Sequence, residues 1–250
     1  MRGVLLAGGT GSRMEPLTRA VNKHLLPVGG EPMLFHGLRH MASLGLEDVM
    51  IVTGSYDVGA LALAVGDGSE FGLEISMRAQ ARPGGIAQAL SLARKFSGND
   101  ALLVMLGDNI FAGDLTSFIQ GFETDSATED ARVLLKQVDD PRRYGVAEVR
   151  EGRVVSIEEK PDEPRSALAV IGAYLYRPDV FDVVQTLRPS TRGELEVSDI
   201  NETYMRRGRL GHREFSGPWI DAGTLASYAK ANAMLAPVTL GHSAPLKVVA

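Results

Sequence analysis

The sequence contains no cysteine among its 250 residues. A disulfide framework, a zinc site built from thiolates and a thiol nucleophile are therefore excluded. The five histidines show no spacing typical of metal ligands. The sequence also lacks the Gly-x-Ser-x-Gly pattern that marks the nucleophile of many hydrolases.

Long hydrophobic runs and an excess of positive charge are missing as well. The apolar run that follows Met1-Arg2 stops at Gly8, which is too short for the core of a signal peptide, and no segment has the length of a membrane span. We therefore expect a cytoplasmic protein without a membrane partner. The formal net charge of −5 argues against a nucleic-acid surface. It leaves an anionic small substrate open, because a few cations and a divalent metal in a cleft can override the overall sign.

Strand-like and helix-like segments alternate along the chain, which predicts a mostly parallel sheet covered by helices. Short strands at 145–149 and 154–157 flank Glu151-Gly152 and predict a hairpin in a smaller, β-rich lobe. We expect one domain, in which residues 1–138 form a nucleotide-binding half and 139–222 a sugar-binding half, followed by a helix and apolar tail over 223–250. The expected strands are 4–7, 49–53, 73–77, 101–106 and 132–138, and the expected helices 31–44, 58–65, 86–96, 115–122, 178–187 and 225–235.

The glycine-rich stretch from Leu6 to Arg13 directly follows the first expected strand. Glycines allow a close main-chain approach to a ligand, and successive N–H groups in such a loop form a concavity suited to an anion. Arg13 adds a fork of donors that matches phosphate oxygens, and Lys23 supplies a second cation nearby. A flexible turn is the alternative, since Met14 interrupts the dinucleotide-binding pattern and no P-loop triplet occurs.

Two aspartates lie next to predicted strands or helices, at positions where an open α/β sheet would bind a ligand. Asp108 comes directly after the most apolar strand, and Asp221 shortly precedes the last helix. Magnesium favours one or two carboxylates together with substrate phosphates, so the pair predicts a Mg²⁺ site. The alternatives are that Asp108 belongs to an ordinary Gly-Asp-Asn turn and that Asp221 or Thr224 caps the helix.

Several motifs in order resemble those of the sugar-1-phosphate nucleotidylyltransferases, and within them the glucose-1-phosphate thymidylyltransferases of short form. The resemblance runs from Gly3 to about Leu235. It is carried by Gly8–Arg13 with Pro16-Leu17-Thr18, Lys23–Pro27, Leu106–Asn109, Asp140–Val146, Glu158–Pro161, Val170–Tyr174 and Arg192–Asn201.

The resemblance implies a Rossmann-like, three-layer α/β/α fold with a mixed, mostly parallel central sheet and a small β-rich sugar-binding lobe. It implies that dTTP (or UTP) and glucose 1-phosphate react to give dTDP-glucose and pyrophosphate. Because both reactants are anions, catalysis would rest on positioning and charge neutralisation by Mg²⁺ and cationic side chains, without a covalent enzyme intermediate.

The same resemblance assigns roles to individual residues. Gln80 and the main chain of Gly85 would contact the base, because a primary amide both donates and accepts, although a plain strand-to-helix turn also accounts for Gly84-Gly85. The implied catalytic residues are Arg13, Lys23 and Lys160, and the metal ligands are Asp108 and Asp221. The implied nucleotide-binding residues are Leu6, Gly8, Gly9, Thr10, Gly11, Ser12, Arg13, Lys23, Gln80, Gly85 and Asp108. The implied sugar-phosphate-binding residues are Asn109, Tyr144, Gly145, Glu159, Lys160, Ile171, Gly172 and Tyr174.

Some alternatives stay open at this point. His24 stands where many thymidylyltransferases have glutamine, which leaves the choice between dTTP and UTP, and thus a uridylyltransferase, undecided. A non-catalytic nucleotide-sugar-binding regulatory protein is disfavoured because Arg13, Lys23, Asp108 and Asp221 occur together. A metal-dependent glycosyltransferase would not need the Arg13 loop. Longer relatives carry further C-terminal helices, which leaves a regulatory nucleotide site undecided here, whereas a homo-oligomer is expected by analogy.

Overall fold

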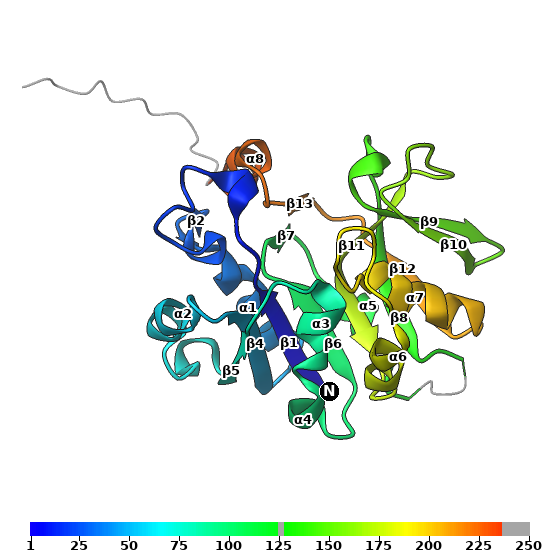
Figure 1. The fold of residues 1–250 in the computed structure, drawn as a ribbon, viewed down its shortest axis with the longest axis horizontal. Coiled ribbons are helices and arrows are strands. Elements are labelled where there is room, and N and C mark those ends of the chain that lie inside the picture. The colour runs from blue at the N-terminus through cyan, green and yellow to red at the C-terminus, as the bar shows by residue number, and fades with distance from the viewer. Residues whose placement is uncertain (125–127, 237–250) are drawn as a thin grey trace, which may run out of the picture.

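A computed structural model describes residues 1–124 and 128–236; the expected apolar tail lies outside the described residues. Its framework is a parallel array in the order β5–β4–β1–β6 (Figure 1). These strands span Glu74–Gln80, Asp48–Gly54, Arg2–Ala7 and Leu102–Leu106. Strands β4, β1 and β6 contain short apolar runs, as expected of parallel strands that are covered on both faces, whereas the edge strand β5 alternates between exposed and partly buried residues.

The second half of the sheet continues from β6 through antiparallel pairing. Strand β11 (Leu168–Tyr176) pairs with β6 through residues 173–176, and it also contacts two further groups of strands. One group is the hairpin β9–β10, and the other is β8 with β12. These strands span Gly145–Arg150, Arg153–Glu159, Ala131–Gln137 and Leu210–Glu214.

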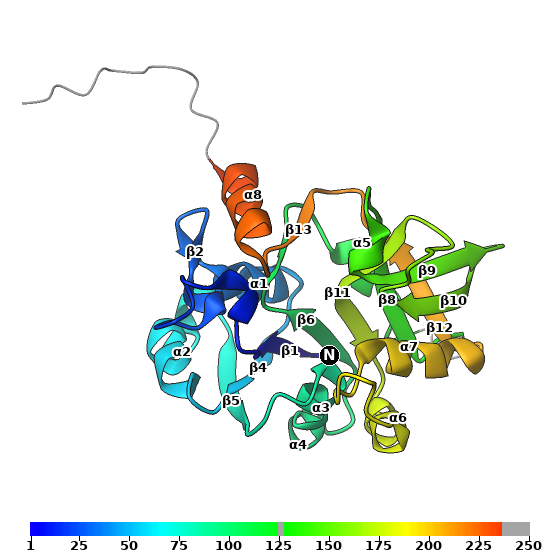
Figure 2. The ribbon, with the colours of Figure 1, turned by 45° about the horizontal axis from the view of Figure 1, so that its top comes forward.

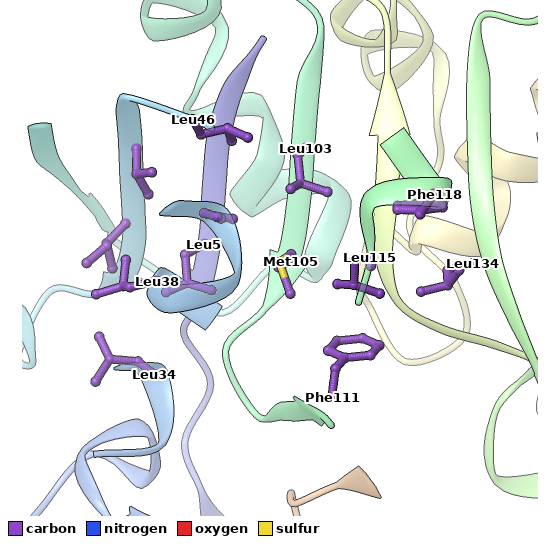
Figure 3. Packing of buried hydrophobic residues seen from close by; sticks show 14 of the residues in the cluster. Leu5, Leu34, Leu38, Leu46, Leu103, Met105, Phe111, Leu115, Phe118 and Leu134 are labelled. Atoms are coloured by element: carbon purple, nitrogen blue, oxygen red, sulfur yellow. The ribbon is translucent and has the colours of Figure 1, made fainter. Parts of the chain in front are cut away.

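Helices cover both faces of this mixed sheet, so the expected three-layer α/β/α fold is confirmed. Alternating side chains of β1 explain the two cores: Leu5 packs on one face, and Val4 and Leu6 pack on the other. In Figure 3, Leu5 lies with Leu34 and Leu38 in the first core. That face carries α1 (Met33–Ser43), α2 (Val58–Val65) and α5 (Thr116–Ile119), and the opposite face carries α3 (Ile86–Ser91), α4 (Arg94–Ser97), α6 (Val180–Thr186) and α7 (Val197–Arg206).

Two small antiparallel pairs lie outside the main sheet. Strand β2 (Pro27–Val28) pairs with β3 (Glu31–Pro32), so the helix expected from Glu31 begins only at Met33. Strand β7 (Asn109–Phe111) pairs with β13 (Trp219–Asp221), and Figures 1 and 2 show this pair between the two halves of the molecule. The chain then enters α8 (Leu225–Leu235).

Other expected helices differ in detail. The segment 86–96 is broken into α3 and α4 at Leu92-Ala93. Single 3-10 turns occupy Ser12–Met14, Lys23–Leu25, Ser69–Phe71 and Pro141–Arg143. No helix in the described part of the chain is both long and apolar enough to cross a membrane.

Candidate active site

A cavity of about 500 Å³ lies beyond the carboxyl ends of β1 and β6, between the two halves of the molecule. This is the edge of an open α/β sheet where ligands bind. Most residues that the sequence singled out surround it. They are Leu6, Gly8, Gly9, Arg13, Lys23, Gln80, Gly85, Asp108, Asn109, Tyr144, Gly145, Glu159, Lys160, Gly172, Tyr174 and Asp221.

Four expected site residues lie outside the set of described residues that line this cavity: Thr10, Gly11, Ser12 and Ile171. The Thr10 and Ser12 hydroxyl groups contact each other, and the Gly11 carbonyl accepts a hydrogen bond from Thr18 at 2.8 Å. Ile171 is buried in the core because its side chain leaves β11 on the face opposite to the cavity. Its neighbours Val170 and Gly172 line the cavity instead.

The pairing of β7 with β13 brings the two aspartates together. Asp221 lies opposite Asn109 in the pair, and the N–H of Ala222 donates to the main-chain oxygen of Asp108 at 2.8 Å. A Cβ placed on Gly223 would lie 2.8 Å from Asp221 Oδ1 and 3.1 Å from Asp108 Oδ2. It would also lie 3.1 Å from Arg13 Nη2. Two carboxylates and a guanidinium therefore converge on one point that only a glycine leaves open.

Helix capping does not account for Asp221. The N-cap of α8 is Thr224, whose hydroxyl accepts from the N–H of Ser227, while the Ser227 side chain accepts from Thr224. Asp221 instead accepts a bond from the N–H of Gly223 at 2.8 Å. The carboxylate is therefore aimed into the cavity by its own turn.

The two carboxylates differ in charge environment. Burial opposes ionisation of Asp108, but the ammonium of Lys23, which contacts Oδ2, and the amide of Asn109 hold the pKa of Asp108 well below its usual range. Burial and the neighbouring Asp108 raise the pKa of Asp221. The ammonium of Lys23 therefore compensates the charge of Asp108. The carboxylate of Asp221, beside it, favours the binding of a further cation.

Asn109, expected to contact the sugar, is engaged within the protein. Its Oδ1 accepts from the N–H of Gly172 at 3.1 Å and from Trp219 Nε1 at 2.8 Å. Its Nδ2 donates to Asp108 Oδ1 at 2.9 Å. A Cβ on Gly172 would lie 2.5 Å from Asn109 Cγ, so the amide fits only against a glycine. Asn109 thus orients the Asp108 carboxylate, and Trp219 orients Asn109.

We expect Trp219→Phe to lower turnover by roughly three- to tenfold, because loss of one buried donor frees the Asn109 amide and loosens Asp108. Steady-state pyrophosphate release measures this. The control is Tyr228→Phe, which removes one hydrogen bond to the Pro27 carbonyl from a residue outside the described lining of the cavity. Equal turnover in the two variants would contradict the role of Trp219.

The end of the cavity where the sequence motifs predict the base is built around Gly84-Gly85 at the start of α3. Gly85 has φ +94°, and a Cβ there would lie 2.8 Å from the Leu195 nitrogen and closer still to its oxygen. The Leu195 N–H donates to the Gly84 oxygen at 2.8 Å. This turn is therefore clamped against the loop that precedes α7, and glycine is required by both conformation and space.

We expect Gly85→Ala to lower the free energy of unfolding by at least about 3 kcal/mol, because it adds a main-chain collision to the unfavourable φ. Gly98→Ala is the matched control, since Gly98 has φ +56° with nothing within 4 Å of its Cβ position. It should lose only about 1–2 kcal/mol. Urea denaturation compares the two, and equal losses would rule out the collision with Leu195.

The end of the cavity where the sequence motifs predict the sugar phosphate carries a network of charges. Lys160, which has the unusual φ of +46°, places Nζ 3.1 Å from Glu159 Oε1. Arg192 Nη2 lies 3.4 Å from Glu159 Oε1 and 2.9 Å from Glu196 Oε1. Ser190 donates to Glu196 Oε1 at 2.8 Å. Opposed charges therefore hold Lys160 and Arg192 at the cavity wall.

Sequence reasoning left several lining residues unassigned. Arg143 and Arg192 lie inside motifs that the sequence singled out, and Trp219 is the single tryptophan of the chain, two residues before Asp221. Glu194 also lines the cavity. The motifs identify these segments, but the side chains that face the cavity are selected by the conformation of each segment in the fold.

His24, the departure noted in the sequence, is a buried neutral residue. It is 1% exposed, and its Nδ1 lies 2.8 Å from Asn22 Oδ1. Burial and the adjacent Lys23 lower the pKa of His24 to about 3. Asn22 thus sets the Nδ1–H tautomer, and the imidazole carries no charge at neutral pH.

The described residues contain no group of three or more histidine, aspartate or glutamate side chains arranged to hold a metal. The Asp108–Asp221 pair nevertheless fits a magnesium-type ion, which binds through one or two carboxylates and takes its other ligands from water and phosphate. The cradle above Gly223 and the ammonium already seated on Asp108 both show that the site favours cations.

A mixed α/β sheet with paired carboxylates, cationic side chains and a glycine-rich first loop at its carboxyl edge defines a protein that binds phosphorylated nucleotides. The model of the nucleotidyl transferase family matches residues 2–237. The chain belongs to the nucleotidyl transferase family, so the family and enzyme class inferred from the sequence motifs are confirmed.

Similar proteins carry more specific names. A Neisseria meningitidis glucose-1-phosphate thymidylyltransferase is 43% identical over 92% of this chain and 81% of its own length. One from Actinoplanes is 42% identical over 92% of this chain and 77% of its own. A structure of a Bacillus anthracis protein assigned as a glucose-1-phosphate thymidylyltransferase, in complex with sucrose, has a TM-score of 0.90 and 47% identity, covering 97% of this chain and 98% of its own. A UDP-glucose pyrophosphorylase structure, at 24% identity and a TM-score of 0.81 over 93% of this chain and 97% of its own, shares the fold.

Proposed function

We propose that this protein is a Mg²⁺-dependent nucleotidyltransferase that forms dTDP-glucose and pyrophosphate from dTTP and glucose 1-phosphate. The observation that carries the proposal is the convergence of Asp108, Asp221 and Arg13 on the point above Gly223, in one cavity with Lys23 and Lys160. The thymidylyltransferase relatives supply the identity of the substrates.

The reaction brings two anions together. An oxygen of the sugar phosphate attacks the α-phosphorus of the nucleotide, the new P–O bond forms, and the bond to pyrophosphate breaks. The guanidinium of Arg13 binds the leaving pyrophosphate, and the ammonium of Lys23 stabilises the negative charge that develops at the α-phosphoryl group. Lys160, held by Glu159, orients the attacking phosphate. Neither a side-chain nucleophile nor a covalent intermediate is required.

Asp108 and Asp221 would hold the metal ion, which when bound neutralises nucleotide phosphate charge and orients the triphosphate. Asn109 and Trp219 keep the Asp108 carboxylate in position for it. Lys23 contacts Asp108 Oδ2 directly, so its ammonium would share this carboxylate with the ion.

Nucleotide and sugar phosphate would occupy different halves of the molecule. Residues 1–138 form the half that holds the triphosphate and the base, and residues 139–222 form the half that holds the sugar phosphate, with 223–250 following at the C-terminus. Glu159 accepts hydrogen bonds from sugar hydroxyl groups, and Gly145 lets the ring approach the main chain, whereas the space beside Gly172 is taken by the Asn109 amide. We further propose a homo-oligomer.

The test combines the purified protein with Mg²⁺, each nucleoside triphosphate in turn and a panel of sugar 1-phosphates, and measures pyrophosphate release. We expect release with dTTP and glucose 1-phosphate above all other pairs. Preferred release with UTP would replace the proposal by a uridylyltransferase. No release with any pair would reject the enzymatic function.

A further inference from the structure

The NH₂ group of the Gln80 side-chain amide is held by two oxygen atoms of the protein. Gln80 Nε2 donates to Gln88 Oε1 at 2.5 Å and lies 3.4 Å from the Gly85 carbonyl oxygen. A main-chain carbonyl only accepts hydrogen bonds, so the NH₂ end of Gln80 is the end that faces this side. The contact with Gly85 identifies this end as the NH₂ group, and the much shorter contact with Gln88 is the stronger of the two hydrogen bonds that hold it there.

The oxygen end of Gln80 faces the other way. A Cβ placed on Gly8 would lie 3.0 Å from Gln80 Oε1, and both residues line the cavity. Gln80 is 7% exposed, so its amide is confined by its surroundings. The nucleotide end of the cavity therefore presents a hydrogen-bond acceptor at this position.

Gln88 is the residue whose side chain holds the NH₂ group of Gln80. It lies on α3, one turn after Gly85, half-buried and outside the set of described residues that line the cavity. Its contribution to a ligand can therefore act only through Gln80. If its side chain supplied a donor instead of an acceptor, the Gln80 amide would be driven to turn over and present NH₂ to the cavity.

We propose that Gln88 is a positioning residue that sets the specificity for the nucleobase by fixing the polarity of the Gln80 amide. An acceptor on Gln80 matches the ring N3–H of a pyrimidine dione such as thymine or uracil. The same acceptor disfavours cytosine, because N3 of cytosine is itself a hydrogen-bond acceptor. This inference rests on the proposed function for the presence of a pyrimidine nucleotide, and it adds the residue that selects the class of base.

Three substitutions of similar length test it. Gln88→Glu keeps an acceptor, Gln88→Met removes it, and Gln88→Lys supplies a donor. The dissociation constants of dTTP, UTP and dCTP are measured with Mg²⁺ and without sugar phosphate, by fluorescence of Trp219, which lines the cavity. Thermal melting of each variant verifies that it is folded.

We expect the wild-type protein and Gln88→Glu to prefer dTTP over dCTP equally. The preference should fall by at least about fivefold in Gln88→Met and further in Gln88→Lys, since one hydrogen bond is lost and then reversed. The ratio of dTTP to UTP should stay constant in all variants, because both bases carry N3–H. A general loosening of the fold would not produce this pattern.

An unchanged preference in Gln88→Lys, an equal loss in Gln88→Glu and Gln88→Lys, or a wild-type protein without preference for dTTP over dCTP would overturn the inference. Pyrophosphate release by the wild-type protein is measured in parallel. If pyrophosphate is released but the preference for dTTP over dCTP is the same in all Gln88 variants, the inference fails and the proposed function stands. If the preference follows residue 88 but no pair yields pyrophosphate, the proposed function fails and the inference stands for a nucleotide-binding site.

Discussion

Replacing Asp108 by asparagine should lower turnover at least about 100-fold, which corresponds to roughly 2.7 kcal/mol of barrier. The reason is geometric and electrostatic. Asp108 Oδ2 is one of the atoms that converge above Gly223, and it also holds the ammonium of Lys23. The substitution removes the charge while it preserves the side-chain shape, so both cations lose their common anchor.

Two measurements separate this effect from a folding defect. Mg²⁺ should raise the melting temperature of the wild-type protein and leave that of Asp108→Asn nearly unchanged, because ligand binding to the native state stabilises it. Asp114→Asn serves as the control, since Asp114 is exposed and bonded to Thr116 at a turn. Near-normal turnover of Asp108→Asn in magnesium buffer would remove Asp108 from the proposed metal site.

Replacing Lys23 by methionine should lower turnover by about 100- to 1000-fold and also destabilise the protein near neutral pH. The catalytic loss follows from removal of a cation beside the reacting phosphate. The stability loss follows because Asp108 is left buried without its counter-charge, which costs about 3–5 kcal/mol.

The stability loss should depend on pH in a defined direction. In the wild-type protein the pKa of Asp108 is lowered, so its ion pair contributes stability above the carboxyl's unfolded pKa of about 3.9, and that contribution is lost as the pH falls. In Lys23→Met, burial dominates and raises this pKa, so the penalty is greatest at neutral pH and shrinks in acid. The difference in unfolding free energy between wild type and variant should therefore narrow between about pH 7 and pH 4.

Lys136→Met provides the control for this pH profile. Lys136 Nζ donates to the Gly217 carbonyl at 2.7 Å, and Lys136 is not among the described residues that line the cavity. Its replacement should cost stability by an amount that stays level over the same pH range, because its acceptor does not titrate. A level profile for Lys23→Met as well would contradict the ion pair with Asp108.

The framework of the molecule could be predicted because it depends on local signals. The apolar runs around Leu5, Ile51 and Leu103 alternate with amphipathic segments, and this alone predicts parallel strands with covering helices. The glycine-rich loop after β1 and the aspartate after β6 could then be placed at one edge of the sheet, since the carboxyl ends of parallel strands share that edge.

Details that depend on contacts between distant segments were not predictable in the same way. Helix α3 ends near Ser91 although the sequence continues in a helical pattern. Helix α7 begins at Val197 with Glu196 as its N-cap, but the Glu196 side chain makes no capping hydrogen bond. Glu196 is drawn instead toward Ser190 and Arg192. Where a helix begins or ends and which partner a side chain contacts are decided here by tertiary interactions, which local sequence propensity does not include.

The sequence by itself determined the chemistry that is available: two carboxylates, a loop that can wrap phosphate, and arginine and lysine side chains of fixed charge, on a scaffold set by hydrophobic periodicity. The tertiary structure decided which of these groups meet. The antiparallel pairing of β7 with β13 joins Asp108 to Asp221 across more than a hundred residues, and the Asn109 amide in this pair supports the Asp108 carboxylate. The side chain of Ile171 points into the core for a similar reason, because the strand register, rather than the residue type, selects the face.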